Sequence, residues 1–359
     1  MANVQKQFDE FHGKIKLERF DENKALRDER DAVLKALREG LKKVFEDKEE
    51  DTPTFWTFNQ GSYAMNTGVK PLAGGEYDID VGVVLNVAMD GRDAVDVKKW
   101  VRDALANYEQ GAEIRRSCVT VFKPGYHVDL AVYADPELSA NRKLNLAKGK
   151  ENSGEDHRFW QVSDPQGFQD LIATKLDGDD ARQFRRCIRY LKRWRDERFS
   201  SDGSAAPIGI GLTAAAYHWF EVSKRTDAVS LKVTYDDREA LEKFVQRLLD
   251  NFSLVWDAED QRFYSRLKVN LPVEPYGDLF SKMTGLQMEA FKAKLETLLG
   301  ALQTARSKLE VHDACAELAK HFGADFPVPD KEKSSTPTGR AVAGSGSSGC
   351  AVGPQVEQD

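Results

Sequence analysis

Glu76-Tyr-Asp78-Ile-Asp80-Val81 begins a run of apolar residues and is the most informative stretch of this 359-residue sequence. Side chains at positions i and i+2 of a strand share a face, so a strand here carries Asp78 and Asp80 together while Ile79 enters the core. Two adjacent carboxylates repel unless a positive charge lies between them. Mg²⁺ commonly binds through one or two carboxylates and the phosphates of a substrate. The pattern therefore predicts a metal site, although Asp-x-Asp at a strand start is also typical of a solvated turn.

Two further features favour the metal site. Gln60-Gly61-Ser62 follows a predicted strand and precedes a predicted short helix at 63–67, where free N–H groups and the helix dipole favour a phosphate. Tyr126-His-Val-Asp129 begins an apolar strand with one acid in its middle, and a carboxylate is costly to bury there without a partner. A metal ion shared with the first two acids would satisfy Asp129. The other interpretation is a salt-bridged or half-exposed strand residue.

The order of the predicted elements indicates an α+β first half of the chain and a helical second half. The first half has a long amphipathic helix at 22–48, strands at 54–58, 78–87, 113–122 and 126–133, a helix at 93–108 and a polar, irregular segment at 135–158. Lys123-Pro124-Gly125 is typical of a turn, so the last two strands form a hairpin. The second half has helical periodicity at 166–176, 179–198, 208–222, 236–254, 286–308 and 311–322.

The helix predicted at 179–198 carries several arginines on one side. They are Arg182, Arg185, Arg186, Arg189 and Arg193, with apolar residues roughly opposite. Charged faces of helices are usually solvated, so the simplest expectation is that these side chains are exposed.

The composition is that of a globular protein, with 41% hydrophobic and 31% charged residues and a formal net charge of -7. No apolar run approaches the roughly 20 residues of a membrane-spanning helix. The first residues lack the apolar core of a secretory signal, so we expect a cytoplasmic protein with no membrane segment. The four cysteines are widely separated, which argues against a zinc cluster or a disulfide framework.

Together, the three motifs resemble the active-site signature of the nucleotidyltransferases related to polymerase β. The surrounding sequence resembles more narrowly the bacterial cGAS/DncV-like nucleotidyltransferases, or CD-NTases, which make cyclic di- and trinucleotides in anti-phage signalling. The segments that carry this resemblance are QGSYAMNTGVKP from residue 60, EYDIDVGVVL from 76, YHVDLAVY from 126 and LKRWR from 191. The resemblance covers roughly residues 1–325 and implies a mixed sheet with helices, packed against a helical C-terminal lobe.

The resemblance implies how the nucleotide is bound. Gln60, Gly61 and Ser62 would hold the donor triphosphate, and Lys192 would contact its phosphates. The expected substrates are NTPs, including ATP.

The resemblance also implies a two-metal site. Asp78 and Asp80 would bind two Mg²⁺ ions, with Mn²⁺ as an alternative. Asp129 would complete the site next to the acceptor 3′-hydroxyl and help to deprotonate it. Two metal ions can stabilise both the attacking and the leaving oxygen of an in-line displacement.

The resemblance divides the chain into three parts. Residues 1–160 would form the nucleotidyltransferase core with an N-terminal spine helix, 161–328 a helical lobe that closes the nucleotide site, and 329–359 a disordered tail. The tail is rich in Ser and Gly and cannot bury enough surface to offset its ordering entropy. We expect it to be either a peptide ligand for a HORMA-like regulatory protein or an expression scar. The zinc insertion of the animal relatives is missing, so no DNA-activated switch of that kind is expected.

Three functions remain open from the sequence. The first is a template-independent enzyme that joins NTPs, releases pyrophosphate and closes the product into a ring. The second is a linear oligonucleotide or RNA-tailing transferase, which should carry a basic RNA-binding domain that the acidic net charge does not indicate. The third is an inactive nucleotide-binding scaffold, against which the presence of all three carboxylates argues.

Overall fold

The computed structural model describes residues 2–18, 23–46, 48–136, 143–200 and 205–331. Residues 1–329 form one compact unit and 330–359 a second. The predicted tail therefore lies outside the described residues beyond position 331. In the described part of the chain, no helix combines the length and the apolar character needed to cross a bilayer.

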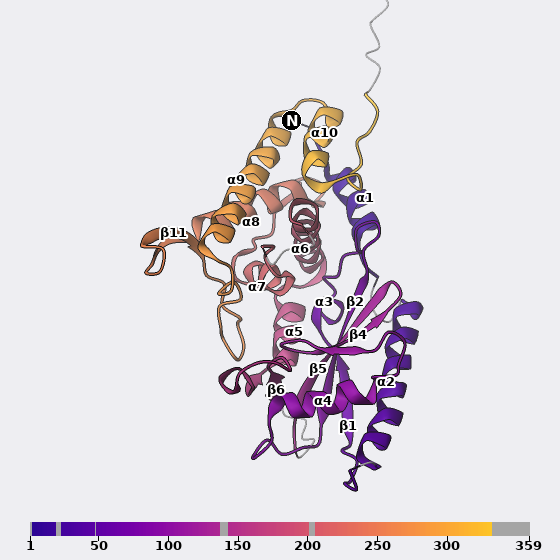
Figure 1. The fold of residues 1–359 in the computed structure, drawn as a ribbon. Coiled ribbons are helices and arrows are strands. Elements are labelled where there is room, and N and C mark those ends of the chain that lie inside the picture. Colours follow the sequence, from indigo (N-terminus) through magenta and orange to yellow (C-terminus); the bar gives the residue numbers. More distant parts are fainter. Residues whose placement is uncertain (1, 19–22, 47, 137–142, 201–204, 332–359) are drawn as a thin grey trace, which may run out of the picture. The chain divides into compact units, whose positions relative to one another are not determined.

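Helices and strands alternate in the first half of the compact unit 1–329, and helices dominate the second (Figure 1). The helices are α1 (Gln5–Ile15), α2 (Lys24–Glu46), α3 (Gly61–Ala64), α4 (Ala94–Ala104), α5 (Pro165–Thr174), α6 (Gly178–Arg198), α7 (Gly209–Trp219), α8 (Asp237–Asp250), α9 (Gly285–Ser307) and α10 (Val311–Phe322). The strands are β1 (Phe55–Asn59), β2 (Tyr77–Leu85), β3 (Ala112–Ile114), β4 (Val119–Lys123), β5 (Tyr126–Ala134), β6 (Leu144–Lys148), β7 (Phe159–Ser163), β8 (Lys224–Thr226), β9 (Val233–Tyr235), β10 (Phe252–Asp257) and β11 (Arg262–Leu267).

A seven-stranded mixed sheet forms the sheet lobe. Its order is β1-β2-β5-β4-β3, and β6 pairs with both β5 and β7. The neighbours β2 and β5 run parallel, whereas the other pairs are antiparallel. The register places Asp80 opposite Asp129 and Asp78 opposite His127. Acids that are far apart in the sequence therefore lie on adjacent strands.

The two faces of this sheet differ because successive side chains of a strand point to opposite sides. Ile79, Val81 and Val83 of β2 enter the larger core of the lobe, to which α2 and α4 contribute one apolar face each. The other face carries Asp78 and Asp80, followed along the same side by a smaller apolar cluster that includes Tyr133. Burial of one face thus forces the acids onto the other.

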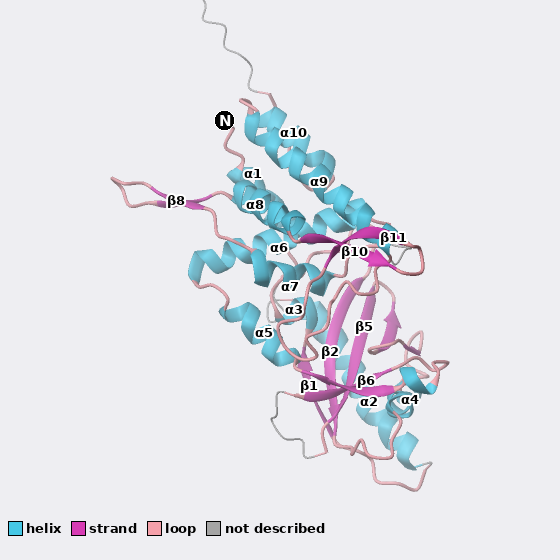
Figure 2. Ribbon diagram, turned by 90° about the vertical axis from the view of Figure 1, so that its left-hand side faces the viewer, coloured by secondary structure: helices cyan, strands magenta, loops and turns pink. Residues whose placement is uncertain are grey.

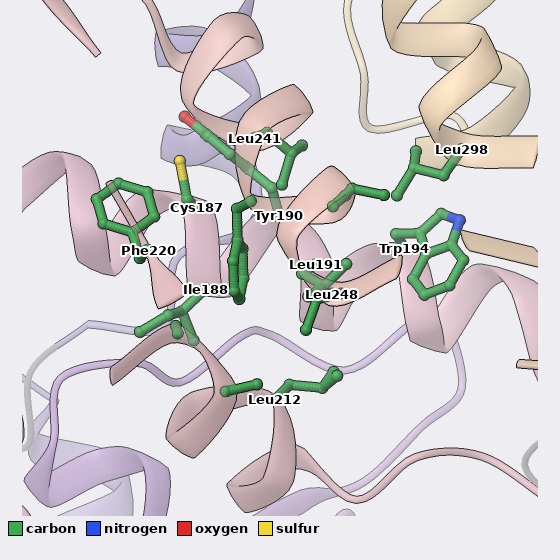
Figure 3. Packing of buried hydrophobic residues seen from close by; sticks show 14 of the residues in the cluster. Cys187, Ile188, Tyr190, Leu191, Trp194, Leu212, Phe220, Leu241, Leu248 and Leu298 are labelled. Atoms are coloured by element: carbon green, nitrogen blue, oxygen red, sulfur yellow. The ribbon is translucent and has the colours of Figure 1, made fainter. Parts of the chain in front are cut away.

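The helical lobe is built around α6, which contacts α1, α7, α8 and α10. Figure 3 shows Tyr190 and Trp194 of α6 among Leu241 and Leu248 of α8, and all four side chains are fully buried. Full burial of one large apolar side chain is worth about 1.5–3 kcal/mol, so this packing fixes the position of α6 firmly. The helix α1, which the sequence did not predict, also packs here, with Phe8 against the Tyr190 ring.

The predicted α+β class with a helical second half is confirmed (Figure 2). Three local predictions are wrong. Residues 113–122 form two paired strands rather than one, because the buried Lys98 ammonium binds the carbonyls of Arg115 and Arg116 and holds a turn there. The segment 135–158 contains β6, whose backbone pairs with β5 and β7. The helix predicted at 236–254 ends at Asp250, and β10 begins at Phe252 and pairs with β11; the other hairpin, β8–β9, lies between two predicted helices.

The expectation of a solvated arginine face on α6 is also wrong for most of its members. Arg189 and Arg193 are buried, and Arg186 pairs with the buried Asp237 at 2.6 Å. The Arg189 guanidinium donates to the Gly68 carbonyl at 3.1 Å. Only tertiary packing of other segments onto α6 creates these partners, so the sequence of the helix alone could not reveal them. Arg182 is exposed as expected.

Candidate active site

The three predicted acids meet on the open face of the sheet. Asp78, Asp80 and Asp129 each offer one carboxylate oxygen, and these oxygens all lie within 4.8 Å of one another. Asp78 is exposed, and the other two are half-buried. Parallel pairing of β2 with β5 brings them together. Hard carboxylate oxygens at this spacing could hold a divalent metal ion.

Mutual repulsion is visible in the ionisation of these groups. Burial raises the pKa of Asp80 well above its ordinary value, and the charges of Asp78 and Asp129 raise it further, against the opposing effect of Lys192. The pKa of Asp78 rises to about 6 through burial in the surrounding protein and the charge of Asp129, while His127 opposes the rise. The tip of Asp78 still meets solvent, so part of this effect is screened. A bound cation would relieve the repulsion, which supports the fit of this site to a metal ion.

Gly61 allows the loop after β1 to approach Asp80. Its φ is +70°, and a Cβ at this position would lie 1.8 Å from Asp80 Oδ2. The Gln60 N–H donates to the Asp80 carbonyl at 3.1 Å, and the Tyr133 hydroxyl donates to Gln60 Oε1 at 3.0 Å. The loop is thus fixed against the carboxylate from both sides. Gly61 is also the first residue of α3 (Gly61–Ala64), a single turn that begins and ends earlier than the predicted helix at 63–67.

A cleft of about 770 Å³ opens in front of the acids and is lined by both lobes. This volume is within the usual range for a small-molecule site. Among the lining residues are, from the sheet lobe, Gln60, Gly61, Ser62, Asp78 and Asp80, and from the helical lobe Lys192, Arg195, Asp196, Phe199, Gly209 and Ile210. Of the three acids, which we call the triad, Asp129 is the one that does not line this cleft.

Lys192 supplies a buried positive charge to the cleft. Its Nζ donates to both the carbonyl and the hydroxyl of Thr67 at 3.1 Å, so the loop after Ser62 holds the ammonium in place. Burial, together with the charges of the nearby Arg195 and Arg189, lowers the pKa of Lys192 to about 7, against the opposing effect of Asp196 and Asp80. An anion in the cleft would favour the charged form of this lysine.

All seven predicted site residues therefore belong to one region. Sequence reasoning missed Arg195, which lies one helical turn after Lys192 and whose spacing could have revealed it. It also missed Tyr133 and Glu274, which line the cleft from β5 and from a distant loop. No local pattern marks Glu274, because its position depends on the tertiary fold alone. The catalytic and binding roles of these residues remain predictions.

Comparisons with known proteins agree with the sequence-based resemblance. Residues 53–133 match the family model for "Cyclic GMP-AMP synthase DncV-like, nucleotidyltransferase domain". A curated relative, a cyclic GMP-AMP synthase from Escherichia albertii, is 27% identical over 251 residues, which cover 66% of this chain and 53% of that protein. The chain thus aligns with about half the length of this relative.

Solved structures of DncV from Vibrio cholerae share the fold. The GTP-bound form has a TM-score of 0.68 and 20% identity, over 90% of this chain and 96% of that one. The DncV structure that holds the linear intermediate pppA(3′,5′)pG has a TM-score of 0.65 and 19% identity, over 90% and 96% of the two chains. The predicted fold is therefore confirmed over nine-tenths of the chain.

The raised pKa of Asp78 predicts how the stability of the metal-free protein depends on pH. An acid with a higher pKa in the folded state binds protons more tightly when folded, so its stabilising contribution is present below about pH 4 and is lost as the pH rises through about 6. In EDTA, Asp78→Asn should therefore raise the melting temperature more at about pH 7 than at about pH 4. The exposed Asp51 offers a control, Asp51→Asn. An equal effect of Asp78→Asn at both pH values would contradict the raised pKa of Asp78.

The contact between Gly61 and Asp80 predicts a loss of metal binding in Gly61→Ala. Gly74 is a matched control because its φ is also positive, at +81°, but nothing lies within 4 Å of its Cβ position. Both alanines strain the backbone, and only the one at 61 displaces the Asp80 carboxylate. We expect Gly61→Ala to weaken Mn²⁺ binding by about tenfold or more, measured by electron paramagnetic resonance, and Gly74→Ala to leave it unchanged. Equal affinities in the two variants would exclude this role of Gly61.

Proposed function

We propose that this chain, whose residues 53–133 belong to the DncV-like nucleotidyltransferases, joins NTPs without a template and closes the product into a cyclic oligonucleotide. The observation that carries the proposal is the meeting of three carboxylates from two parallel strands beside a cleft that also contains the buried Lys192. Carboxylates for metal ions and a cation for phosphates are the groups that phosphoryl transfer requires.

Each of the residues in and beside the cleft would have a separate role in the nucleotidyl transfer. Two Mg²⁺ ions bound by Asp78, Asp80 and Asp129 would neutralise the charge that develops on the attacking and leaving oxygens. Ser62 and Lys192 would hold the donor triphosphate, since Lys192 is kept beside the loop of Ser62 by Thr67. Asp129, outside the cleft, would face the acceptor and help to remove the proton of its 3′-hydroxyl.

Similarity supports a cyclic dinucleotide as the product. The curated relative is named a cyclic GMP-AMP synthase, and solved forms of DncV contain GTP or the linear intermediate pppA(3′,5′)pG. A linear dinucleotide contains one new phosphodiester bond, and a second bond is needed to close the ring. We therefore propose that ATP and GTP are substrates here and that the enzyme carries out two successive nucleotidyl transfers. A cyclic trinucleotide would require a third transfer before closure.

The two alternative functions receive less support. An RNA-tailing enzyme needs a basic surface for the polymer, whereas this chain has a net charge of -7. A scaffold without activity would not need these three acids, since burial and then their mutual repulsion raise the pKa of Asp78 and Asp80. The role in anti-phage signalling, the cytoplasmic location and a HORMA-like partner of the tail stay predictions.

Product analysis tests the proposal. The full chain is incubated with Mg²⁺ and all four NTPs, treated with phosphatase and examined by mass spectrometry. We expect a phosphatase-resistant product with the mass of a cyclic dinucleotide, together with pyrophosphate. The double variant Asp78→Ala, Asp80→Ala should lower turnover by about a hundredfold or more, because it removes several kcal/mol of transition-state stabilisation. The control Asp51→Ala should match the wild type.

The other outcomes identify the alternatives. A product that phosphatase shortens would indicate a linear oligonucleotide transferase. Binding of NTPs with no product at all would indicate a scaffold. Equal turnover in the double variant and the wild type would show that the activity does not depend on Asp78 and Asp80.

A further inference from the structure

Thr120 has no role in the function proposed above, yet it touches the carboxylate that faces the acceptor. It lies on β4 directly opposite Asp129 on β5, and only 5% of its surface is exposed. Its hydroxyl donates a hydrogen bond to Asp129 Oδ1 at 2.5 Å. At this length the hydroxyl is in direct hydrogen-bond contact with the carboxylate.

Cys118 completes a short chain of hydrogen bonds. Its Sγ lies 3.7 Å from Thr120 Oγ1. Either atom could be the donor in this contact, and Cys118 also forms a side-chain hydrogen bond with Asp129. Cys118 therefore contacts both members of the Thr120–Asp129 pair.

Such a hydrogen bond matters because of the repulsion within the triad. The outer torsion of an aspartate is broad, so its carboxylate turns easily. The charges of Asp78 and Asp80 push the Asp129 carboxylate away from the common point when no cation is present. A hydrogen bond to one oxygen restricts this rotation and leaves the second oxygen available. Groups that orient metal-binding carboxylates in this way commonly change metal affinity by about 10- to 100-fold.

We propose that Thr120 is a positioning residue, which holds the Asp129 carboxylate in the orientation that binds a divalent ion beside the acceptor hydroxyl. The inference rests on the proposed function for its catalytic part and on the geometry of the three acids for its binding part. Thr120 does not line the cleft, so it acts through Asp129 and not on the donor nucleotide.

The test compares two substitutions of Thr120. Thr120→Val removes the hydroxyl at nearly constant shape, and Thr120→Ser keeps it. Thr57→Val is the matched control, because Thr57 lies on β1 opposite Val83, on the face covered by α2 and α4. Binding of Mn²⁺ alone is followed by electron paramagnetic resonance, and folding by circular dichroism.

We expect Thr120→Val to weaken Mn²⁺ binding by about 10- to 100-fold, and Thr120→Ser and Thr57→Val to stay within about threefold of the wild type. Turnover of NTPs by Thr120→Val should show a lower kcat with little change in KM. In an Asp129→Ala background, Thr120→Val should have no further effect on Mn²⁺ binding.

Several results would overturn the inference. Thr120→Val would contradict it by binding Mn²⁺ with wild-type affinity. It would also contradict it by lowering the Mn²⁺ affinity of the Asp129→Ala variant further. If Thr120→Val does not fold, a loss of Mn²⁺ affinity in the folded Thr120→Ser would contradict the role of the hydroxyl. If the wild type makes no product, the proposed function fails, whereas Mn²⁺ binding still decides whether Thr120 positions Asp129.

Discussion

Repulsion among three carboxylates is the constraint on which the rest of this structure depends. The parallel register of β2 and β5 places Asp80 beside Asp129, and the strand alternation adds Asp78 on the same face. Folding alone would not favour such a cluster, since burial and mutual charge raise the pKa of Asp78 and Asp80. A fold that keeps the cluster must hold it by other means. The core between the sheet and helices α2 and α4 supplies that support, because it fixes which face each side chain takes.

The helical lobe adds the positive side of the site. Helix α6 is buried against α1, α7, α8 and α10, and this packing brings Lys192 and Arg195 to the cleft. The segment from Gln60 to Thr67 contacts both the acids and the lysine. Gly61 packs on Asp80, and Thr67 accepts hydrogen bonds from Lys192. The acids that we propose to bind metal ions and the lysine that we propose to bind phosphates are thus fixed relative to each other through one short segment of chain.

The sequence predicted those parts of the site that depend on local geometry. The spacing of Asp78 and Asp80 determines that they share a face, whatever strand lies beside them. The meeting with Asp129 depends on the strand order, which the sequence alone does not determine; it was expected only because a lone acid on an apolar strand needs a partner, and the family resemblance supported it. Thr120 was not recognised, although the predicted hairpin across Lys123-Pro124-Gly125 is present as the pairing of β4 with β5. Its contact with Asp129 depends on the register of that pairing, which was not predicted from the sequence. Burial of Arg189 likewise depends on the carbonyl of Gly68, which no helical pattern contains.

The central claim is that the three acids bind metal ions that also contact the triphosphate of a bound nucleotide. Its most direct test is a crystal structure of the chain with Mn²⁺ and a nonhydrolysable NTP, with manganese located by anomalous scattering. The account predicts two manganese peaks at about 2.0–2.3 Å from carboxylate oxygens of Asp78 and Asp80, with Asp129 bound to one of them and the phosphates near Lys192. A triphosphate bound in the cleft with no manganese at these acids, or with Asp129 turned away from the metal ions, would contradict it.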